Sequence, residues 1–150
     1  MLPYGGGGNT SSYAQALAEL GVEVPIVSTE AADRRNTMAT AIRIGDPVHA
    51  ASVHSAGARV VVVDDGEIVA AWSRLAAEEG LFCEPSSAAG LAAVLRGDVE
   101  GERLVVTITG HGLKDPAAAD RYAPPPVVVE ADPDAIAGAS RPGTAGRATP

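Results

Sequence analysis

The sequence predicts an α/β fold with a mostly parallel sheet flanked by helices. Two apolar, β-branched runs, RVVVV at residues 59–63 and LVVTI at residues 104–108, have the composition of buried strands. Segments with helical periodicity and capping residues lie between these runs. Strands that alternate with helices favour parallel pairing, because each helix returns the chain to the start of the next strand.

The first strand–helix unit lies at the N-terminus. Residues 2–4 are expected to end a strand, and residues 10–20 to form a helix that Gly21 ends. Residues 22–27 are apolar but include Pro25, which has no N–H group to donate within a sheet. That run is therefore a poor candidate for a central strand.

Two short helices are expected before the strand at residues 59–63. Residues 36–44 (NTMATAIRI) are predicted to be helical up to a Gly-Asp-Pro break. Residues 48–56 are predicted to form the second of these helices.

The segment after residue 63 carries the clearest helix signals. Asp64 and Glu67 have the spacing of a capping box, and apolar residues follow with helical period up to Gly80. Residues 81–84 are expected to form a short strand, and Pro85 to begin another helix. The chain is then predicted to divide into an α/β unit, residues 1–123, and a largely disordered Pro/Ala/Gly-rich tail, residues 124–150.

Composition argues against several classes of partner. The chain has 11 basic and 19 acidic residues, a net charge of −8 and no basic run, so binding to nucleic acid or to an anionic membrane is not expected. No apolar run is long enough to span a bilayer, and the single cysteine, Cys83, favours a reducing compartment. We therefore expect a cytoplasmic protein. His49 and His54 fall on different helix faces without a further ligand nearby in sequence, so no metal site is predicted.

Two loops at strand ends carry the candidate chemistry, because ligands of α/β sheets collect at the carboxyl ends of the strands. In the first, residues 5–9 (GGGGN), backbone N–H groups can converge on an anion such as phosphate, aided by the dipole of the following helix. A flexible linker is the alternative for this run. The second loop, TGHGLKDP from Thr109, is either a cofactor contact or an ordinary strand-to-helix turn.

Other polar residues have simpler interpretations. Lys114, the only lysine, is expected to be solvated, and His111 to bind backbone groups of its own turn. Cys83 is expected to be an inert core residue. Ser86 and Ser87 are expected to cap the helix that begins at Pro85.

Four stretches, LPYGGGGNTSSY, TMATAIRIGDP, EEGLFCEPSSAAGLAA and VTITGHGLKDP, resemble threonine synthase in their order and spacing. The resemblance implies that the chain is part of the large domain of a pyridoxal-phosphate (PLP) enzyme of fold type II. The implied reaction converts O-phospho-L-homoserine and water to L-threonine and phosphate, a step of threonine biosynthesis. Serine and threonine dehydratases share the glycine loop and CEPSSA more loosely, so a dehydratase-like PLP enzyme is the alternative.

The resemblance also implies roles for single residues. In that family the glycine loop wraps the phosphate of PLP, and a threonine lies beside the pyridine nitrogen. The implied cofactor-binding residues are Gly5, Gly6, Gly7, Gly8, Asn9 and Thr109. A threonine hydroxyl can hydrogen-bond the ring nitrogen but cannot protonate it.

Two features set this chain apart from the family. Its segment between residues 13 and 37 is shorter than the family's. The family's Schiff-base lysine and substrate-binding domain lie upstream of the glycine loop, so the resemblance covers only the C-terminal part, and we expect no catalytic residue and no activity in this chain alone. The implied partners are an amino-acid substrate, the missing N-terminal part or a partner chain, and a second copy in a homodimer of the complete enzyme. A non-catalytic truncated product is a further alternative.

Overall fold

The computed structural model describes residues 1–140 and contains a parallel three-stranded sheet in the order β1-β2-β3. The strands are β1 (Leu2–Pro3), β2 (Val27–Ala31) and β3 (Arg59–Val63). Ser28 of the central strand lies opposite Leu2 on one side and Val60 on the other. The α/β class and the parallel pairing predicted from the sequence are therefore confirmed.

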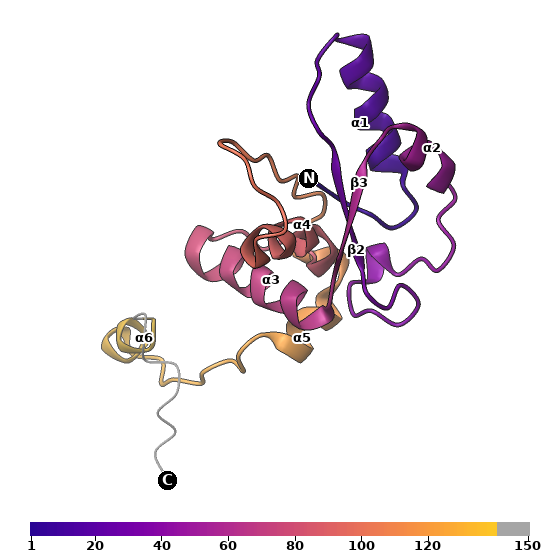
Figure 1. Ribbon diagram of the computed structural model, residues 1–150. Coiled ribbons are helices and arrows are strands. Elements are labelled where there is room, and N and C mark those ends of the chain that lie inside the picture. The colour runs from indigo at the N-terminus through magenta and orange to yellow at the C-terminus, as the bar shows by residue number, and fades with distance from the viewer. Residues whose placement is uncertain (141–150) are drawn as a thin grey trace.

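Helices cover both faces of this sheet (Figure 1). On one side lie α1 (Gly8–Glu19) and α2 (Ala50–Ser55), and on the other α3 (Asp65–Glu79) and α4 (Pro85–Arg96). The remaining elements are two 3₁₀ turns, η1 (Thr40–Ile42) and η2 (Gly112–Lys114), and the short helices α5 (Pro116–Tyr122) and α6 (Pro133–Ala139). No helix within residues 1–140 is long and apolar enough to cross a membrane.

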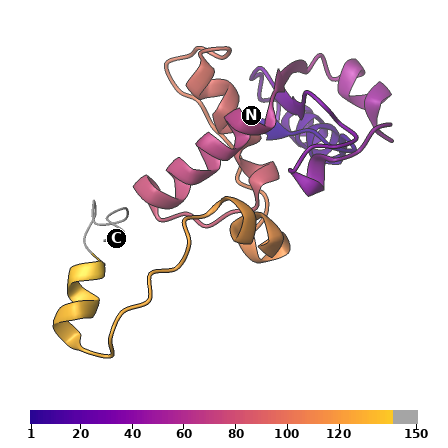
Figure 2. The same cartoon turned by 90° about the horizontal axis from the view of Figure 1, so that it is seen from below.

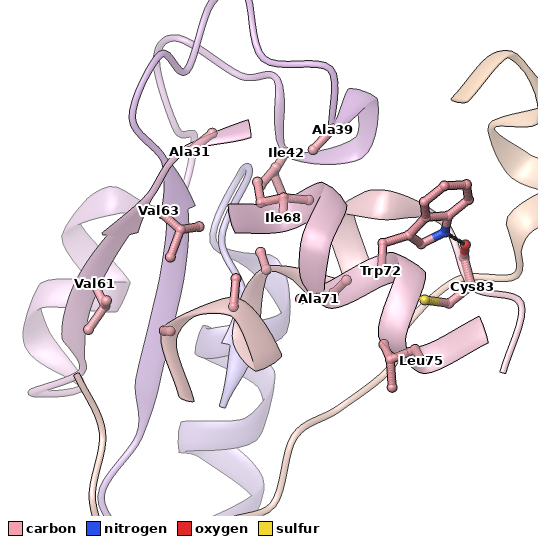
Figure 3. Close-up of a cluster of buried hydrophobic side chains, with 14 of the residues drawn as sticks. Ala31, Ala39, Ile42, Val61, Val63, Ile68, Ala71, Trp72, Leu75 and Cys83 are labelled. Carbon is pink, nitrogen blue, oxygen red and sulfur yellow. Dashed lines mark hydrogen bonds between the residues drawn. The ribbon is translucent and has the colours of Figure 1, made fainter. Parts of the chain in front are cut away.

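The main core lies between the sheet and the α3–α4 pair (Figure 3). It is built largely from Ala, Val, Ile and Leu side chains, and Ile68 and Ala71 of α3 are fully buried in it. Trp72 closes one end, where its Nε1 donates to the carbonyl oxygen of Cys83 at 2.6 Å. The cysteine is buried, as the sequence predicts, and burial raises the pKa of its thiol.

The helices with strong local signals form where they are predicted. The Asp64–Glu67 capping box is present in both directions, and Gly80 ends α3 with a φ of +67°. Helix α4 begins at Pro85. Helix α1 begins at Gly8, two residues earlier than predicted, so the last glycine of the run already belongs to its first turn.

The prediction of a helix at residues 36–44 is wrong, because only η1 forms there. Distant side chains bind this segment instead: Asp65 accepts hydrogen bonds from the Thr37 hydroxyl and the Met38 amide. Ser86 Oγ accepts the Ala41 amide at 3.0 Å. These tertiary hydrogen bonds compete with the helical pattern and replace it.

The central strand was not predicted from the sequence. Residues 22–26 are irregular, as expected for the run that contains Pro25, and β2 starts at Val27 and continues through three polar residues. Ser28 is buried there because its hydroxyl shares a 2.7 Å hydrogen bond with the hydroxyl of Thr10. The hydrogen bond to Thr10 offsets the cost of burying the Ser28 hydroxyl in this strand.

Two further strand predictions are wrong. Residues 81–84 contribute a single antiparallel bridge, Cys83 to His111, rather than a strand. Residues 104–108 run alongside Met1, whose carbonyl accepts the Thr107 amide at 3.1 Å, but form no ladder and leave Val105 70% exposed. Strand β3 is present as predicted but lies at a sheet edge, where Val60 and Val62 are exposed.

The C-terminal part of the described chain stands apart from the α/β body (Figures 1 and 2). Residues 123–134 are exposed, and α6 has no buried residue. The helix is ordered locally by Asp132, whose carboxylate accepts the Ala135 amide at 2.9 Å. Residues 141–150 of the predicted tail lie outside the described residues, and the division at residue 123 stays a prediction.

Candidate functional site

A cavity of about 360 Å³ lies at the carboxyl end of β1. All the site residues predicted from the sequence line it, together with residues of the other two motifs. Its lining comprises Pro3, Gly5, Gly6, Gly7, Gly8, Asn9, Ala41, Ile42, Glu84, Ser86, Thr109 and Lys114. The fold therefore brings the glycine loop and Thr109, about a hundred residues apart in sequence, to one place.

The glycine loop presents free backbone donors to this cavity. Gly7 is the N-cap of α1 and has no side chain, so the amides of the first turn, from Gly8 to Thr10, receive no side-chain cap. Unpaired first-turn amides and the helix dipole together favour an anion at this end of α1.

The four glycines are not equivalent. A Cβ on Gly5 would lie 2.7 Å from the carbonyl oxygen of Ala41, and one on Gly7 2.9 Å from Val53 Cγ2. Gly7 also has a φ of +91°, a backbone conformation that favours glycine. A Cβ on Gly6 or Gly8 would have its closest protein atom at 3.8 Å or 3.9 Å. Close contacts with neighbouring residues thus require glycine at positions 5 and 7. Gly6 and Gly8 have room for a side chain or a ligand.

Ser87 binds the Thr109 loop. Its Oγ accepts the amides of Thr109 at 3.1 Å and Gly110 at 2.9 Å, and lies 2.9 Å from the hydroxyl of Thr109. The two amides occupy both acceptor sites of Ser87, so Ser87 donates its own proton to Thr109 Oγ1. Thr109 keeps its proton free to donate to a third group in the cavity.

Ser86 and Ser87 therefore do not cap α4, whose N-cap is Glu84 and which has no side-chain capping hydrogen bond. Each serine is buried and ties a different loop to the start of the helix. The Thr40 hydroxyl completes the link by donating to Asp115 Oδ2 at 2.7 Å. As a result, the motifs that contain residues 37–44, 83–89 and 107–116 meet at one wall of the cavity.

Sequence reasoning missed Glu84 as a lining residue. Its side chain is only 4% exposed, and its carboxylate lies so close to Gly110 that a Cβ there would be 2.1 Å from Oε1. Lys114 Nζ lies 3.6 Å from the same oxygen, with 63% of its side chain exposed. Lys114 is thus solvated as predicted but also lines the cavity. The sequence signal for Glu84 was an acidic residue directly before Pro85.

The remaining candidate groups are a histidine of the Thr109 loop and possible metal ligands. His111 accepts the Leu113 amide at 3.1 Å through Nδ1, within its own turn as predicted. In the described part of the chain, no three His, Cys, Asp or Glu side chains lie close enough to hold a metal ion. The lining can bind a phosphate group at the glycine loop and hydrogen-bond a polar ring atom at Thr109, and the cavity volume lies in the usual range for small ligands.

Comparison with known proteins gives a family match over most of the chain. The family profile described as "Pyridoxal-phosphate dependent enzyme" matches residues 1–110. Threonine synthase of Methanocaldococcus jannaschii is 46% identical over 105 residues, covering 64% of this chain and 26% of the relative. Threonine synthase of Mycobacterium tuberculosis is 35% identical over 161 residues, covering 90% of this chain and 45% of the relative.

The chain thus spans about a quarter to a half of these relatives' length. The second alignment spans 161 positions, more than the 150 residues of this chain, so the relative has residues that this chain lacks inside the aligned region. Among solved structures, an L-serine ammonia-lyase from Rhizomucor miehei matches with a TM-score of 0.66 at 25% identity, over 81% of this chain and 47% of that one. Maize serine racemase matches with a TM-score of 0.58 at 28% identity, over 65% and 35% respectively.

Proposed function

The chain belongs to the family of pyridoxal-phosphate-dependent enzymes, and from this premise we propose that its cavity is the cofactor site of a threonine synthase. In this proposal Gly5, Gly6, Gly7, Gly8 and Asn9 hold the phosphate of PLP, and Thr109 meets the ring nitrogen. The observation that carries it is that these residues, from both ends of the α/β unit, line a single cavity. When bound, PLP supplies an electron sink for bonds at the substrate's α-carbon.

The chain's own residues would act by binding and orientation. The uncapped amides at the start of α1 would bind the phosphate dianion without any basic side chain. The Thr109 hydroxyl, whose own proton is not used in the bond with Ser87, would donate to an unprotonated ring nitrogen. Glu84 and Lys114 would border the same space as a charge pair.

We propose that the complete protein acts on O-phospho-L-homoserine, releasing phosphate and forming L-threonine. The identity to threonine synthases, 46% to that of M. jannaschii, supports this substrate. The four-glycine loop and the fold shared with an L-serine ammonia-lyase favour a dehydratase-type reaction as the second candidate. Lys114, the only lysine, is paired with Glu84, so we propose that the lysine that holds PLP comes from outside this chain.

The first test measures the binding of PLP to the 150-residue chain, by calorimetry and by the change in the visible absorbance of PLP. We expect reversible binding that inorganic phosphate competes away, with no borohydride-stable label on Lys114. A stoichiometric label on Lys114 would overturn the external-lysine proposal, and no binding to a folded chain would overturn the cofactor site.

The second test concerns the reaction. The N-terminal part of the M. jannaschii relative, fused to this chain, would be assayed with O-phospho-L-homoserine and with L-threonine. Threonine and phosphate from the first substrate support the synthase, whereas 2-oxobutanoate from the second supports the dehydratase. Sedimentation of the active fusion would test the further proposal of a homodimer, and fractionation of the source cells that of a cytoplasmic location.

A further inference from the structure

The carbonyl groups of the glycine loop are bound from outside the cavity. Three successive carbonyl oxygens each accept from a donor that does not line it: Gly5 from Arg34 Nη2 at 2.7 Å, Gly6 from the His49 amide at 2.9 Å, and Gly7 from the Ser11 amide at 3.0 Å. These contacts come from three different parts of the chain. They fix the orientation of three successive peptide groups.

Peptide planarity makes this orientation matter for anion binding. Residues 1–140 contain no cis peptide bond, so the N–H that follows each carbonyl points the opposite way. The amides of Gly6, Gly7 and Gly8 therefore point away from the outside donors. Within the described residues, the amides of Gly6 and Gly7 also have no hydrogen-bond acceptor. They are available to a ligand.

Of these three donors, only that of Arg34 is a side-chain group, whereas those of His49 and Ser11 are backbone amides. The Arg34 side chain is held by several contacts. Its Nε donates to the carbonyl oxygen of Ile44 at 3.0 Å, and its Nη1 pairs with Glu30. Its guanidinium lies 4.6 Å from the centre of the Tyr4 ring, and only 17% of the side chain is exposed. Three nitrogens of one planar group thus serve three acceptors, an arrangement that a lysine ammonium cannot reproduce.

We propose that Arg34 is a positioning residue for the phosphate site: it holds the Gly5–Gly6 peptide so that the Gly6 N–H faces a phosphate monoester in the cavity. The inference rests on the proposed function, since it assigns a residue to the same phosphate. Arg34 acts through the backbone and does not touch the ligand. Glu30 pairs with its charge, so its effect comes from geometry more than from long-range attraction.

The experiment compares Arg34→Lys and Arg34→Met with the matched pair Arg35→Lys and Arg35→Met in the 150-residue chain. Arg35 is adjacent, 70% exposed, paired with Asp46 at 3.0 Å and absent from the glycine loop. Its variants therefore make the same two side-chain changes without removing a contact to the loop. Calorimetry would measure the affinity for PLP, for inorganic phosphate and for pyridoxal, which lacks the phosphate. Amide spectra would report the Gly6 N–H shift on phosphate addition.

We expect both Arg34 variants to weaken PLP and phosphate binding about tenfold, because the Gly6 N–H would lose its hydrogen bond to the charged phosphate. The affinity for pyridoxal should stay within about twofold. The Arg35 variants should bind all three as the native chain does. Equal losses in the Arg35 variants, an equal loss for pyridoxal, or native phosphate affinity in Arg34→Lys would overturn the proposal. Arg34→Lys keeps a cation beside Glu30, so it decides the matter if Arg34→Met does not fold. Failure of the native chain to bind phosphate would instead overturn the proposed function, and this inference with it.

Discussion

Within the glycine loop, the steric effect of an added methyl group differs between positions. At Gly7 it would meet Val53 and the carbonyl of His49 in a left-handed backbone conformation. At Gly6 it would meet no protein atom closer than 3.8 Å, on a residue that lines the cavity. The loop's glycines therefore divide into one set that serves folding and one that leaves room for a ligand.

Alanine substitutions should separate these two effects. We expect Gly7→Ala to lower the free energy of unfolding by roughly 1–2 kcal/mol, the cost of a left-handed alanine, with a further loss from the contact with Val53. Gly6→Ala should change it by less than about 0.5 kcal/mol, yet weaken phosphate binding several-fold because the methyl group takes up ligand space. Urea unfolding and calorimetry measure the two quantities. Equal destabilisation by both variants would contradict the assignment.

Ser87 and Ser86 provide a matched pair of buried serines. Ser87→Ala removes the acceptor of the Thr109 and Gly110 amides, and Ser86→Ala that of the Ala41 amide. We expect each variant to speed hydrogen exchange only at its own amides, and to lower the free energy of unfolding by about 1–3 kcal/mol. Exchange measured by NMR would refute the pairing if Ser86→Ala exposed the amide of Thr109.

Cys83 should give the protein an alkaline sensitivity. Burial raises the pKa of its thiol above that in the unfolded chain, so the stability from the neutral thiol is complete below the unfolded pKa. That stability is lost as the pH rises through the folded pKa. The free energy of unfolding should therefore fall more steeply between pH 7 and pH 10 in the native chain than in Cys83→Ala. Parallel urea titrations of the two proteins in that range would contradict this assignment.

At the scale of single elements, β2 combines a paired and an unpaired hydroxyl. Ser28 shares its hydrogen bond with Thr10 on the α1 face. Thr29 Oγ1, on the other face, is buried and has no hydrogen-bond partner within residues 1–140. A buried polar atom without a partner costs stability, so the two positions should respond in opposite directions to loss of the hydroxyl.

We expect Thr29→Val to raise the free energy of unfolding by about 1 kcal/mol, because it removes the unpaired hydroxyl and keeps the shape of the side chain. Ser28→Ala should lower it by about 1–2 kcal/mol, because the buried hydroxyl of Thr10 then lacks its partner. Thermal or urea unfolding checks both. Destabilisation by Thr29→Val would mean that its hydroxyl is bound in solution.

The contrast between α3 and the segment 36–44 explains how far the sequence could predict these elements. The start of α3 is fixed by Asp64 and Glu67, three residues apart, and such local pairs are visible in a sequence. The conformation of residues 36–44 depends on Asp65 and Ser86, far along the chain, which no local pattern reveals. Strand β2 was missed for the same reason, since the partner of the buried Ser28 hydroxyl is Thr10, in a different element.

The candidate site follows the same division. The glycine loop and Thr109 could be proposed from the sequence because each follows a strand-like run and matches a family motif. Their meeting in one cavity, the role of Ser87 and the contribution of Arg34 depend on contacts between distant segments. Those contacts cannot be predicted from composition or from the spacing of residues in the sequence.

At the scale of the whole molecule, residues 123–140 form a separate appendage. The exposed stretch at residues 123–134 connects α5 to α6, and α6 buries no residue. Glu130 lies within this stretch, beyond α5, whose Ala119 and Tyr122 pack against the core. The stability of the α/β unit should therefore not depend on this appendage.

Limited digestion with a protease specific for glutamate tests this division. We expect an early cut at Glu130, since an exposed, irregular backbone fits a protease well. The melting temperature of the product of this cut should stay within about 1 °C of the native value. Binding of phosphate should be unchanged. Early cuts at Glu67 or Glu84, or a lower melting temperature after cleavage at Glu130, would show that the boundary is wrong.

The hydrogen bond between Thr40 and Asp115 joins residues 75 positions apart, whereas the contact between Arg34 and Gly5 spans only 29. Closing a longer loop costs more chain entropy and slows folding, and chains fold from the N-terminus during synthesis. The wall of the cavity formed by the glycine loop can therefore assemble before the wall that contains Thr109. A molecule that touches both walls stabilises the late contacts by mass action, so the cofactor would act on this chain as a folding factor as well as a reagent.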